Sequence, residues 1–362
     1  MNSSSPRLRV LHFVTGGFSG ATQVAADLCR AEAQGDQIEP VLVLRQKRHT
    51  DMARVQALRD QGLAVHLVPG WSHLHTIWRL MQLCRELQPA VLVAHGFPEH
   101  LIGRWAGLWA GVQRLVQVEH NTRERYTPWS RWQARRLDPH SARLVGVSEG
   151  VRRRLVQLGA PEALTLAIPN GVALQRFDAP LAFDQREPAL IMSARFARQK
   201  DQPTLIRAMA LLKERGLTPT LYLAGSGSSG WRGRSERLVR RLQLPNVQFT
   251  GHVKDMPQRL MGTQIFVLST NWEGMPLALV EAMAAGCACV ATDAPGVQGL
   301  LDDDRGLLVP MRDAKALADA LERLLRDPAL AARLGQRARE RALAEHSLAL
   351  MNERYEALFL GL

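Results

Sequence analysis

The sequence predicts an α/β protein built from two doubly wound domains with parallel sheets. Short runs that are apolar throughout alternate with longer amphipathic segments, and this alternation starts afresh after Ile168–Gly171. Strands without a polar face are typical of a parallel sheet covered by helices on both sides. The length of 362 residues also exceeds what one hydrophobic core usually supports. We therefore expect two domains that face each other across a central cleft, with a ligand at the carboxyl ends of both sheets.

The first half of the chain contains six segments that we expect to be strands. They are Leu8–Val14, Pro40–Leu44, Ala64–Val68, Ala90–Ala94, Leu115–Glu119 and Ala142–Val147. Four intervening segments have helical periodicity: Thr22–Ala33, Met52–Gln61, His73–Leu87 and Glu149–Leu158. The alternation predicts one complete α/β unit in this half.

The second half repeats the pattern after the irregular segment Val172–Pro188. Its expected strands are Leu190–Ser193, Thr220–Ala224, Val247–Thr250, Ile265–Ser269 and Cys287–Thr292. Its expected helices are Gln202–Arg215, Ser235–Leu242, Met256–Met261, Leu277–Ala285, Asp313–Arg326 and Pro328–Leu358. We expect residues 1–172 and about 343–362 to form the amino-terminal domain, and residues 173–342 the carboxy-terminal one.

The charge is unevenly distributed. The net charge is +12, and the segment Arg104–Arg154 has eleven arginines against four acidic residues, together with five aromatic residues that include four tryptophans. Such a surface suits a polyanion, which leaves phosphates, an anionic membrane or nucleic acid open, beside a basic face that only contacts solvent. Four cysteines without a CxxC pair argue against a disulfide framework or structural zinc and favour a reducing cytoplasm. No signal peptide or transmembrane segment is expected, since the longest apolar run is Ala282–Ala291.

Two loops carry candidate phosphate contacts. Gly16–Gly20 lies between an expected strand and an expected helix, where glycines allow close approach of an anion to free backbone N–H groups. This signal is weak, and a plain tight turn remains open. In the second half, Arg195 and Lys200 project from the loop after the first strand, where two cations suit a diphosphate. Two solvated charges on a loop are the alternative.

The segment Ser269–Gly286 is the most informative. Pro276 suits the first position of a helix and Gly286 its carboxy-terminal cap, which places Glu273 in a loop and Glu281 inside the helix. Apolar residues surround Glu281 in the sequence, so a carboxylate there needs a partner. Two vicinal ligand hydroxyls would supply one, and an internal pair or cap is the alternative.

Together these motifs resemble the signature of the family 4 retaining glycosyltransferases. Glu273 and Glu281 form an E-x7-E motif within EGMPLALVEAMAAG, and similar motifs are ARFARQKD, IPNGV and FTGHVKD. The match is dense over about Val145–Leu308. The resemblance implies the GT-B fold of two Rossmann-like domains. It also implies metal-independent transfer of a sugar, of the hexosyltransferase type, from a nucleotide diphosphate donor.

The resemblance also implies a role for each matching residue. Glu281 matches the glutamate that binds the ribose hydroxyls, and Glu273 the one that contacts the donor sugar. Arg195 and Lys200 match the pair that neutralises the leaving diphosphate, and His120 matches a histidine near the reacting carbon. The remaining expected donor contacts are Gly17 and Gly20 near the phosphates, Gly251 and Val253 at the base, and Gly274, Met275, Pro276 and Leu277 at the sugar and phosphate.

The function that we expect is retaining sugar transfer to a glycan or lipid-linked acceptor in lipopolysaccharide or surface polysaccharide synthesis. We expect a UDP-sugar rather than a GDP-sugar as co-substrate, no other cofactor, no metal and no nucleic acid partner. A cytoplasmic protein is expected, with the segment Trp129–Arg136 as a contact to the anionic inner face of the membrane. Two alternatives stay open: a nonhydrolysing nucleotide-sugar epimerase of the same fold, and a basic nucleic-acid-binding protein.

Overall fold

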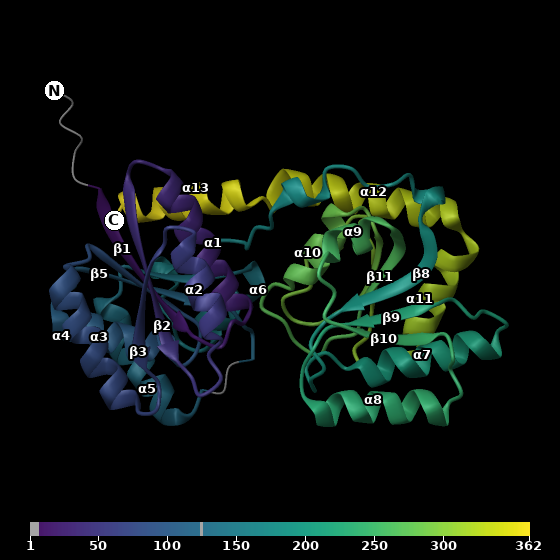
Figure 1. The fold of residues 1–362 in the computed structure, drawn as a ribbon, viewed down its shortest axis with the longest axis horizontal. Coiled ribbons are helices and arrows are strands. Elements are labelled where there is room, and N and C mark those ends of the chain that lie inside the picture. The colour runs from purple at the N-terminus through teal and green to yellow at the C-terminus, as the bar shows by residue number, and fades with distance from the viewer. Residues whose placement is uncertain (1–6, 124–125) are drawn as a thin grey trace. The chain divides into compact units, whose positions relative to one another are not determined.

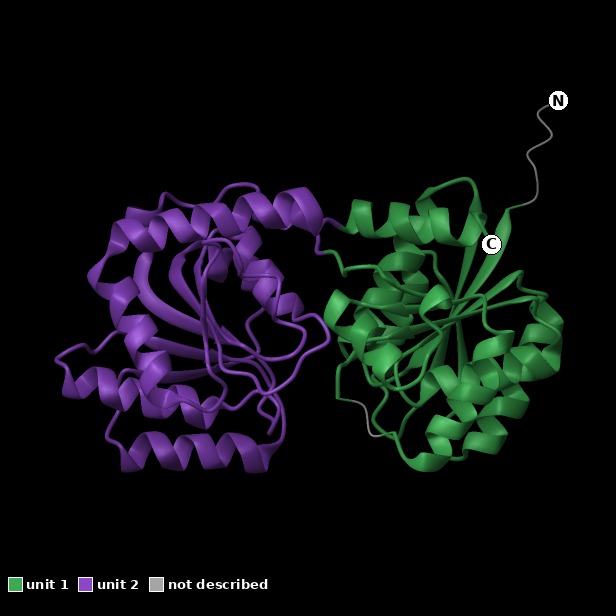
Figure 2. Ribbon diagram, turned by 180° about the vertical axis from the view of Figure 1, so that it is seen from behind, with its two compact units in different colours: residues 1–171, 348–362 green, residues 172–347 purple. Residues whose placement is uncertain are grey.

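The computed structural model describes residues 7–123 and 126–362, which form two compact units (Figure 1). Unit 1 comprises residues 1–171 and 348–362, and unit 2 comprises residues 172–347 (Figure 2). Each unit is an α/β fold with its own parallel sheet, as the alternation of apolar and amphipathic segments predicted.

Unit 1 contains a parallel sheet of seven strands among the described residues, in the order β3-β2-β1-β4-β5-β6-β7. The strand order reverses between β1 and β4, so the carboxyl ends of these two strands flank the switch point where ligands bind in such sheets. The strands are β1 (Leu8–Thr15), β2 (Ile38–Gln46), β3 (Ala64–Pro69), β4 (Val91–His95), β5 (Arg114–Glu119), β6 (Arg143–Gly146) and β7 (Thr165–Ala167).

Helices cover both faces of this sheet, because alternate strand residues pack to opposite sides. In β2, Val41 and Val43 pack in the cluster beneath α3 and α4, whereas Leu42 and Leu44 pack in the cluster beneath α1 and α2. The helices are α1 (Gly20–Gln34), α2 (Met52–Asp60), α3 (His73–Leu87), α4 (Glu99–Ala110), α5 (Pro128–Leu137), α6 (Glu149–Gln157) and α13 (Leu348–Leu360).

Unit 2 contains a parallel sheet in the order β10-β9-β8-β11-β12-β13, with its switch point between β8 and β11. The strands are β8 (Glu187–Ser193), β9 (Leu221–Ala224), β10 (Val247–Gly251), β11 (Thr263–Leu268), β12 (Ala288–Thr292) and β13 (Leu307–Val309). The helices are α7 (Gln202–Glu214), α8 (Ser229–Arg241), α9 (Met256–Met261), α10 (Leu277–Ala284), α11 (Ala314–Arg326) and α12 (Pro328–Glu345).

The segment predicted as one helix over Pro328–Leu358 is two helices. The chain leaves the helical path at His346–Ser347, where Ser347 forms a parallel bridge with Val172 and the Val172 N–H donates to the His346 carbonyl at 2.8 Å. After this break, α13 packs against α1 in unit 1 (Figure 2). The apolar spacing continues through the break, so periodicity alone did not reveal it.

Candidate active site

The carboxyl ends of β8 and β11 bring two loops of unit 2 together, residues 194–201 and residues 269–276. Backbone and side-chain hydrogen bonds join them: the Asn271 N–H donates to the Gln199 carbonyl at 2.8 Å, and the Ser269 hydroxyl lies 3.2 Å from the Lys200 carbonyl oxygen. The switch point of the sheet therefore carries one connected surface that contains several of the predicted site residues.

Glu273 is the centre of this surface. Its side chain is buried, and Lys200 Nζ lies 2.5 Å from Glu273 Oε1. The Thr270 hydroxyl donates to the same oxygen at 2.7 Å, and Gln199 Nε2 donates to Glu273 Oε2 at 3.2 Å. These contacts stabilise a buried carboxylate in a defined orientation. The sequence predicted Glu273 and Lys200 as site residues, but it did not predict their direct contact or the roles of Thr270 and Gln199.

A third loop, which follows β12, also holds Glu273 in place. The Glu273 N–H donates to the Pro295 carbonyl at 2.9 Å. Gly296 has φ +87°, and a Cβ atom there would lie 2.3 Å from the Glu273 carbonyl oxygen. Both the conformation and the close approach require glycine at this position. Gly296 was not predicted from the sequence, although the Ala294-Pro295-Gly296 triplet shortly after a buried strand was a signal for a turn.

The remaining predicted residues of unit 2 lie at the same edge of its sheet. Arg195 is exposed in the loop after β8, and Gly274, Met275 and Pro276 are buried beside Glu273. Pro276 is the N-cap of α10, and Leu277 is its first residue. At the end of β10, Gly251 has φ +67°, and its carbonyl accepts from the Gly225 N–H at 2.7 Å, while Val253 is half-buried.

Glu281 is placed differently from what its sequence neighbours suggested. Leu279, Val280, Ala282 and Met283 are buried on the core side of α10, whereas Glu281 is half-buried on the side that also carries Leu277 and Ala278. The apolar neighbours therefore do not surround its carboxylate. Glu281 lies one turn after the start of α10, whereas Glu273 lies in the loop before the helix.

In unit 1, the glycine loop after β1 is open at the two predicted positions. Gly17 and Gly20 are exposed, and a Cβ atom at Gly20 would have no neighbour within 4 Å. Gly16 is the constrained residue, because a Cβ atom there would lie 2.7 Å from the Arg45 carbonyl oxygen. Ser19 and Thr22 form a capping box that starts α1, and the Thr22 hydroxyl donates to the Thr15 carbonyl at 2.8 Å.

His120 directly follows β5 at the same edge of the unit 1 sheet. Its Nε2 atom lies 3.2 Å from His95 Nδ1, and its backbone N–H donates to Glu119 Oε1 at 2.9 Å. Burial lowers the pKa of His120 to about 3, so the ring is neutral at physiological pH. A neutral imidazole acts as a hydrogen-bond donor and acceptor rather than as a cation.

A network of side chains holds Glu119, which accepts the hydrogen bond from the backbone N–H of His120. The Tyr126 hydroxyl lies 2.7 Å from His100 Nε2 and 3.4 Å from Glu119 Oε2. Arg104 Nη1 in turn donates to Asp138 Oδ1 at 2.8 Å, and Arg104 is fully buried. The prediction of a basic surface is therefore wrong for Arg104, which is an internal structural cation.

Three exposed arginines and two exposed tryptophans of the basic stretch lie on α5. Trp129 and Trp132 are 65% and 53% exposed, and their rings stack with centroids 4.7 Å apart. Arg131, Arg135 and Arg136 are exposed on the same helix. The neighbouring helices also expose tryptophans, namely Trp109 on α4 and Trp78 on α3. Among the helices described here, none has the length and apolar character needed to cross a bilayer.

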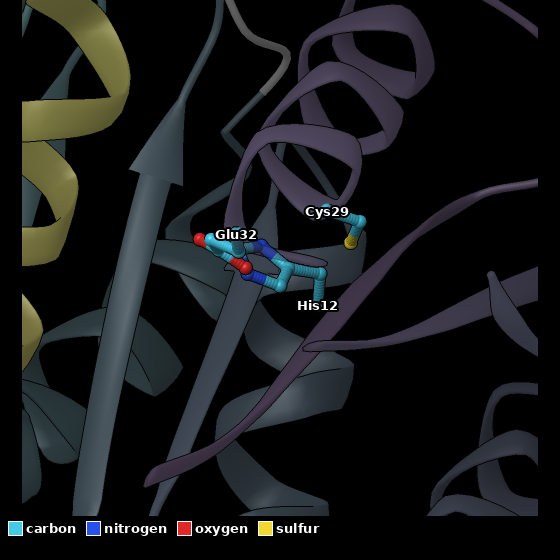
Figure 3. Close-up of side chains that lie close together, drawn as sticks. All are labelled: His12, Cys29 and Glu32. Atoms are coloured by element: carbon cyan, nitrogen blue, oxygen red, sulfur yellow. The ribbon is translucent and has the colours of Figure 1, made fainter. Parts of the chain in front are cut away.

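Three residues of unit 1 have the side chains of a metal site. One ligand atom each from His12, Cys29 and Glu32 lies within 4.8 Å of the other two, and all three are buried (Figure 3). His12 Nε2 and Glu32 Oε2, however, are 3.0 Å apart in a hydrogen bond, and burial raises the pKa of the Cys29 thiol well above its usual range. The residues present therefore fit a hydrogen-bonded pair beside a protonated thiol rather than a set of metal ligands.

Two parallel-sheet units with polar residues at both switch points define the two-domain architecture of sugar transferases of the GT-B type. The model of the family described as Glycosyl transferases group 1 matches residues 175–341, and that of Glycosyltransferase Family 4 matches residues 18–176. The chain belongs to this family of glycosyltransferases, as the motifs of unit 2 predicted.

Individual relatives agree with this assignment. The lipopolysaccharide core biosynthesis glycosyltransferase LpsE of Rhizobium meliloti is 29% identical over 46% of this chain and 48% of its own length. An Escherichia coli enzyme, UDP-Gal:α-D-GlcNAc-diphosphoundecaprenol α-1,3-galactosyltransferase, is 25% identical over 74% of this chain and 73% of its own. EpsD of Bacillus subtilis is 29% identical, and the match spans 60% of this chain and 59% of EpsD.

The fold also matches solved structures. Alr3699/HepE of Anabaena in complex with UDP-glucose has a TM-score of 0.82 and 20% identity, and the match covers 98% of this chain and 100% of that one. At this level of identity the likeness shows the fold, which is the predicted pair of Rossmann-like domains.

Proposed function

We propose that this protein transfers a sugar, with retention of configuration, from a nucleotide diphosphate donor to a glycan or lipid-linked acceptor. The observation that carries the proposal is the Lys200–Glu273 pair at the switch point of unit 2, where Thr270 and Gln199 hold the carboxylate in one orientation. A fixed carboxylate accepts hydrogen bonds from sugar hydroxyls, and cations beside it suit a diphosphate.

The proposed roles follow from the positions of the side chains. Glu273 and the backbone N–H groups of residues 274–277 bind the donor sugar and its phosphates, and Glu281 accepts from the ribose hydroxyls. Gly251 and Val253 border the base. Arg195 and Lys200 stabilise the negative charge that develops on the leaving diphosphate, so the reaction needs no metal ion. In unit 1, Gly17 and Gly20 leave room for phosphate, and neutral His120 contacts a hydroxyl near the reacting carbon.

The proposed function includes a donor, an acceptor and a membrane contact. A UDP-sugar is the expected donor, because several of the similar structures were solved with UDP or UDP-glucose. The acceptor belongs to lipopolysaccharide or surface polysaccharide synthesis, because relatives such as LpsE act there. The exposed tryptophans and arginines of α5 suit an anionic membrane, where tryptophan prefers the headgroup level and arginine pairs with phosphate.

A thermal-shift panel tests the donor, since a ligand that binds only the folded protein raises the melting temperature. UDP-sugars should stabilise the protein at concentrations where GDP-sugars and free sugars do not, with EDTA present throughout. Transfer from the best donor should then give a product with the anomeric configuration of the donor, measured by NMR. An absence of stabilisation by every nucleotide sugar, or an inverted product, would contradict the proposal.

A further inference from the structure

A continuous chain of buried side chains connects His120 to the interior of unit 1. His120 Nε2 lies 3.2 Å from His95 Nδ1, His95 Nε2 lies 3.1 Å from His12 Nδ1, and His12 Nε2 lies 3.0 Å from Glu32 Oε2. Each ring therefore uses one nitrogen toward Glu32, and His12 and His95 use both of their nitrogens within the chain.

The register of the sheet produces this chain. His12 on β1 lies opposite Val93 on β4, and His95 is two residues further along β4. His95 lies opposite Val118 on β5, and His120 is two residues beyond Val118. Because side chains repeat every two residues on one face of a sheet, the three rings step diagonally across three adjacent strands toward the carboxyl edge.

The inner end of the chain is closed to water. His12 and His95 are fully buried and Glu32 is 3% exposed. The Phe359 ring of α13 meets the His12 ring edge-on, with centroids 5.9 Å apart, and Figure 3 shows Glu32 reaching from α1 to the His12 ring. A buried polar group is costly unless it is hydrogen-bonded, so each of these rings depends on its neighbour in the chain.

With Glu32 as a carboxylate and a single proton on His12, the hydrogen bonds allow only one direction. A carboxylate can only accept, so His12 must donate from Nε2, which leaves His12 Nδ1 as an acceptor. His95 must then donate from Nε2 to His12, and His120 must donate from Nε2 to His95. The pKa values of His95 and His120 are lowered by burial, so neither ring carries the second proton that would break this order.

We propose that Glu32, His12 and His95 are positioning residues that hold His120 in its Nε2–H tautomer, so that its Nδ1 atom accepts a hydrogen bond from a hydroxyl of the sugar ligand. His120 Nδ1 makes no hydrogen bond to any residue that the structure describes, and the His120 side chain is partly exposed. The inference rests on the proposed function for the identity of the ligand, whereas the tautomer itself belongs to the protein alone.

The tautomer can be measured without activity. In NMR spectra of the intact protein with 15N-labelled histidine, Nδ1 of His120 should resonate as an unprotonated ring nitrogen and Nε2 as a protonated one. Slowly exchanging Nε2–H protons should be observed for His12, His95 and His120, because these hydrogen bonds exclude water. The signal that disappears in the His120→Ala variant is thereby assigned to His120. A proton on Nδ1 of His120, or a doubly protonated ring, overturns the proposal even if sugar transfer is demonstrated.

Kinetics test whether the chain acts through His120. Glu32→Leu removes the final acceptor and should lower kcat about tenfold or more, whereas Glu32→Gln, whose carbonyl can accept from His12, should stay within about threefold of wild type. In a His120→Ala background both changes should have no further effect on kcat, since the ring through which they act is absent.

Cys29→Ala is the matched control, because Cys29 is buried on α1 one turn before Glu32 and is not part of the hydrogen-bonded chain of histidines. It should leave kcat and the ring N–H signals unchanged while lowering the melting temperature. A loss of kcat on Glu32→Leu that persists in the His120→Ala background, or a Glu32→Gln variant as impaired as Glu32→Leu, would assign Glu32 a purely structural role and overturn the proposal.

Discussion

Lys200 and Glu273 form an ion pair at the switch point of unit 2, with 2.5 Å between Nζ and Oε1, although 73 residues separate them in the sequence. Their side chains are 15% and 7% exposed, so water screens the pair only weakly. The pair joins the loop after β8 to the loop after β11. It therefore links the stability of unit 2 to the geometry of the proposed donor site.

The first prediction concerns stability. Lys200→Met should lower the free energy of unfolding by about 3 kcal/mol, because it leaves the buried carboxylate of Glu273 without its cation. The double variant Lys200→Met/Glu273→Gln should recover at least about 1 kcal/mol of this loss, since no buried charge remains. Urea unfolding of the wild type, the single variants Lys200→Met and Glu273→Gln, and the double variant measures both values. Additive losses in the double variant would mean that the two side chains do not stabilise each other.

The second prediction separates the two glutamates. Glu281→Ala should abolish the rise in melting temperature caused by the nucleoside diphosphate, because Glu281 is expected to hold the ribose. Glu273→Ala should retain that rise, since it removes only the sugar contact and frees Lys200 for the diphosphate. It should weaken stabilisation by the sugar-bearing donor. Thermal shifts with the nucleoside diphosphate and with the intact donor measure both effects. If both variants lose both ligands equally, the division between ribose and sugar is wrong.

The third prediction separates Arg195 from Lys200. Each change to alanine should lower turnover about a hundredfold, because each removes a cation that stabilises the leaving group. Arg195 is exposed, so Arg195→Ala should keep the free energy of unfolding within about 0.5 kcal/mol of wild type, unlike Lys200→Ala. Turnover and urea unfolding are measured on the same preparations, and wild-type turnover should survive EDTA. Strong Mg²⁺ or Mn²⁺ dependence would contradict this account of the leaving group.

The sequence predicted most of the fold because its strands are continuous apolar runs. Helix α4 was not predicted, because its polar residues Glu99, His100 and Arg104 are buried. Polarity therefore does not separate the buried face of this helix from its exposed face. In the candidate site, the sequence motifs marked residues such as Glu273 and Lys200 one by one, and their roles stay predictions. The roles of Gly296, Thr270 and the chain of histidines were not, because they depend on loop packing and on the register of β1, β4 and β5. A histidine within an apolar strand gives no local signal of its partner.

The fourth prediction concerns pH. The pKa values of His95, His100 and His120 are lowered by burial, with the charge of Arg104 contributing at His100. The unfolded chain therefore binds more protons than the folded one below the ordinary histidine pKa of about 6.5. Stability should fall as the pH drops below that value, by about 1.4 kcal/mol per pH unit for each of these histidines.

Urea unfolding at pH 7.5 and at pH 5.5, at constant ionic strength, measures this slope. His95→Gln should reduce the slope, because one fewer buried ring then has to be protonated on unfolding. His140→Gln is the control, since His140 is exposed at the end of its short helix and should leave the slope unchanged. A stability that does not change between the two pH values would show that these rings titrate alike in the folded and unfolded chain.

The last prediction concerns the surface of α5. Wild-type protein should bind vesicles that contain anionic phospholipid at low salt, and Arg131→Glu/Arg135→Glu/Arg136→Glu should abolish binding, because each arginine near such a surface contributes about 1 kcal/mol. Trp129→Ala/Trp132→Ala should weaken vesicle binding by an amount that does not depend on the salt concentration, since tryptophan acts through the headgroup region. Donor-induced thermal stabilisation should persist in both variants, because none of these five residues is among the proposed donor contacts.

The matched control applies the same change of charge elsewhere. Arg207, Arg237 and Arg241 are three exposed arginines on α7 and α8 of unit 2, so changing all three to glutamate alters the net charge by the same amount. If α5 is the contact, this control should reduce vesicle binding far less than the α5 variant does. Equal losses in both triple variants would mean that only the overall positive charge attracts the vesicle. No binding by wild type at low salt would reduce the exposed face of α5 to a solvated basic surface.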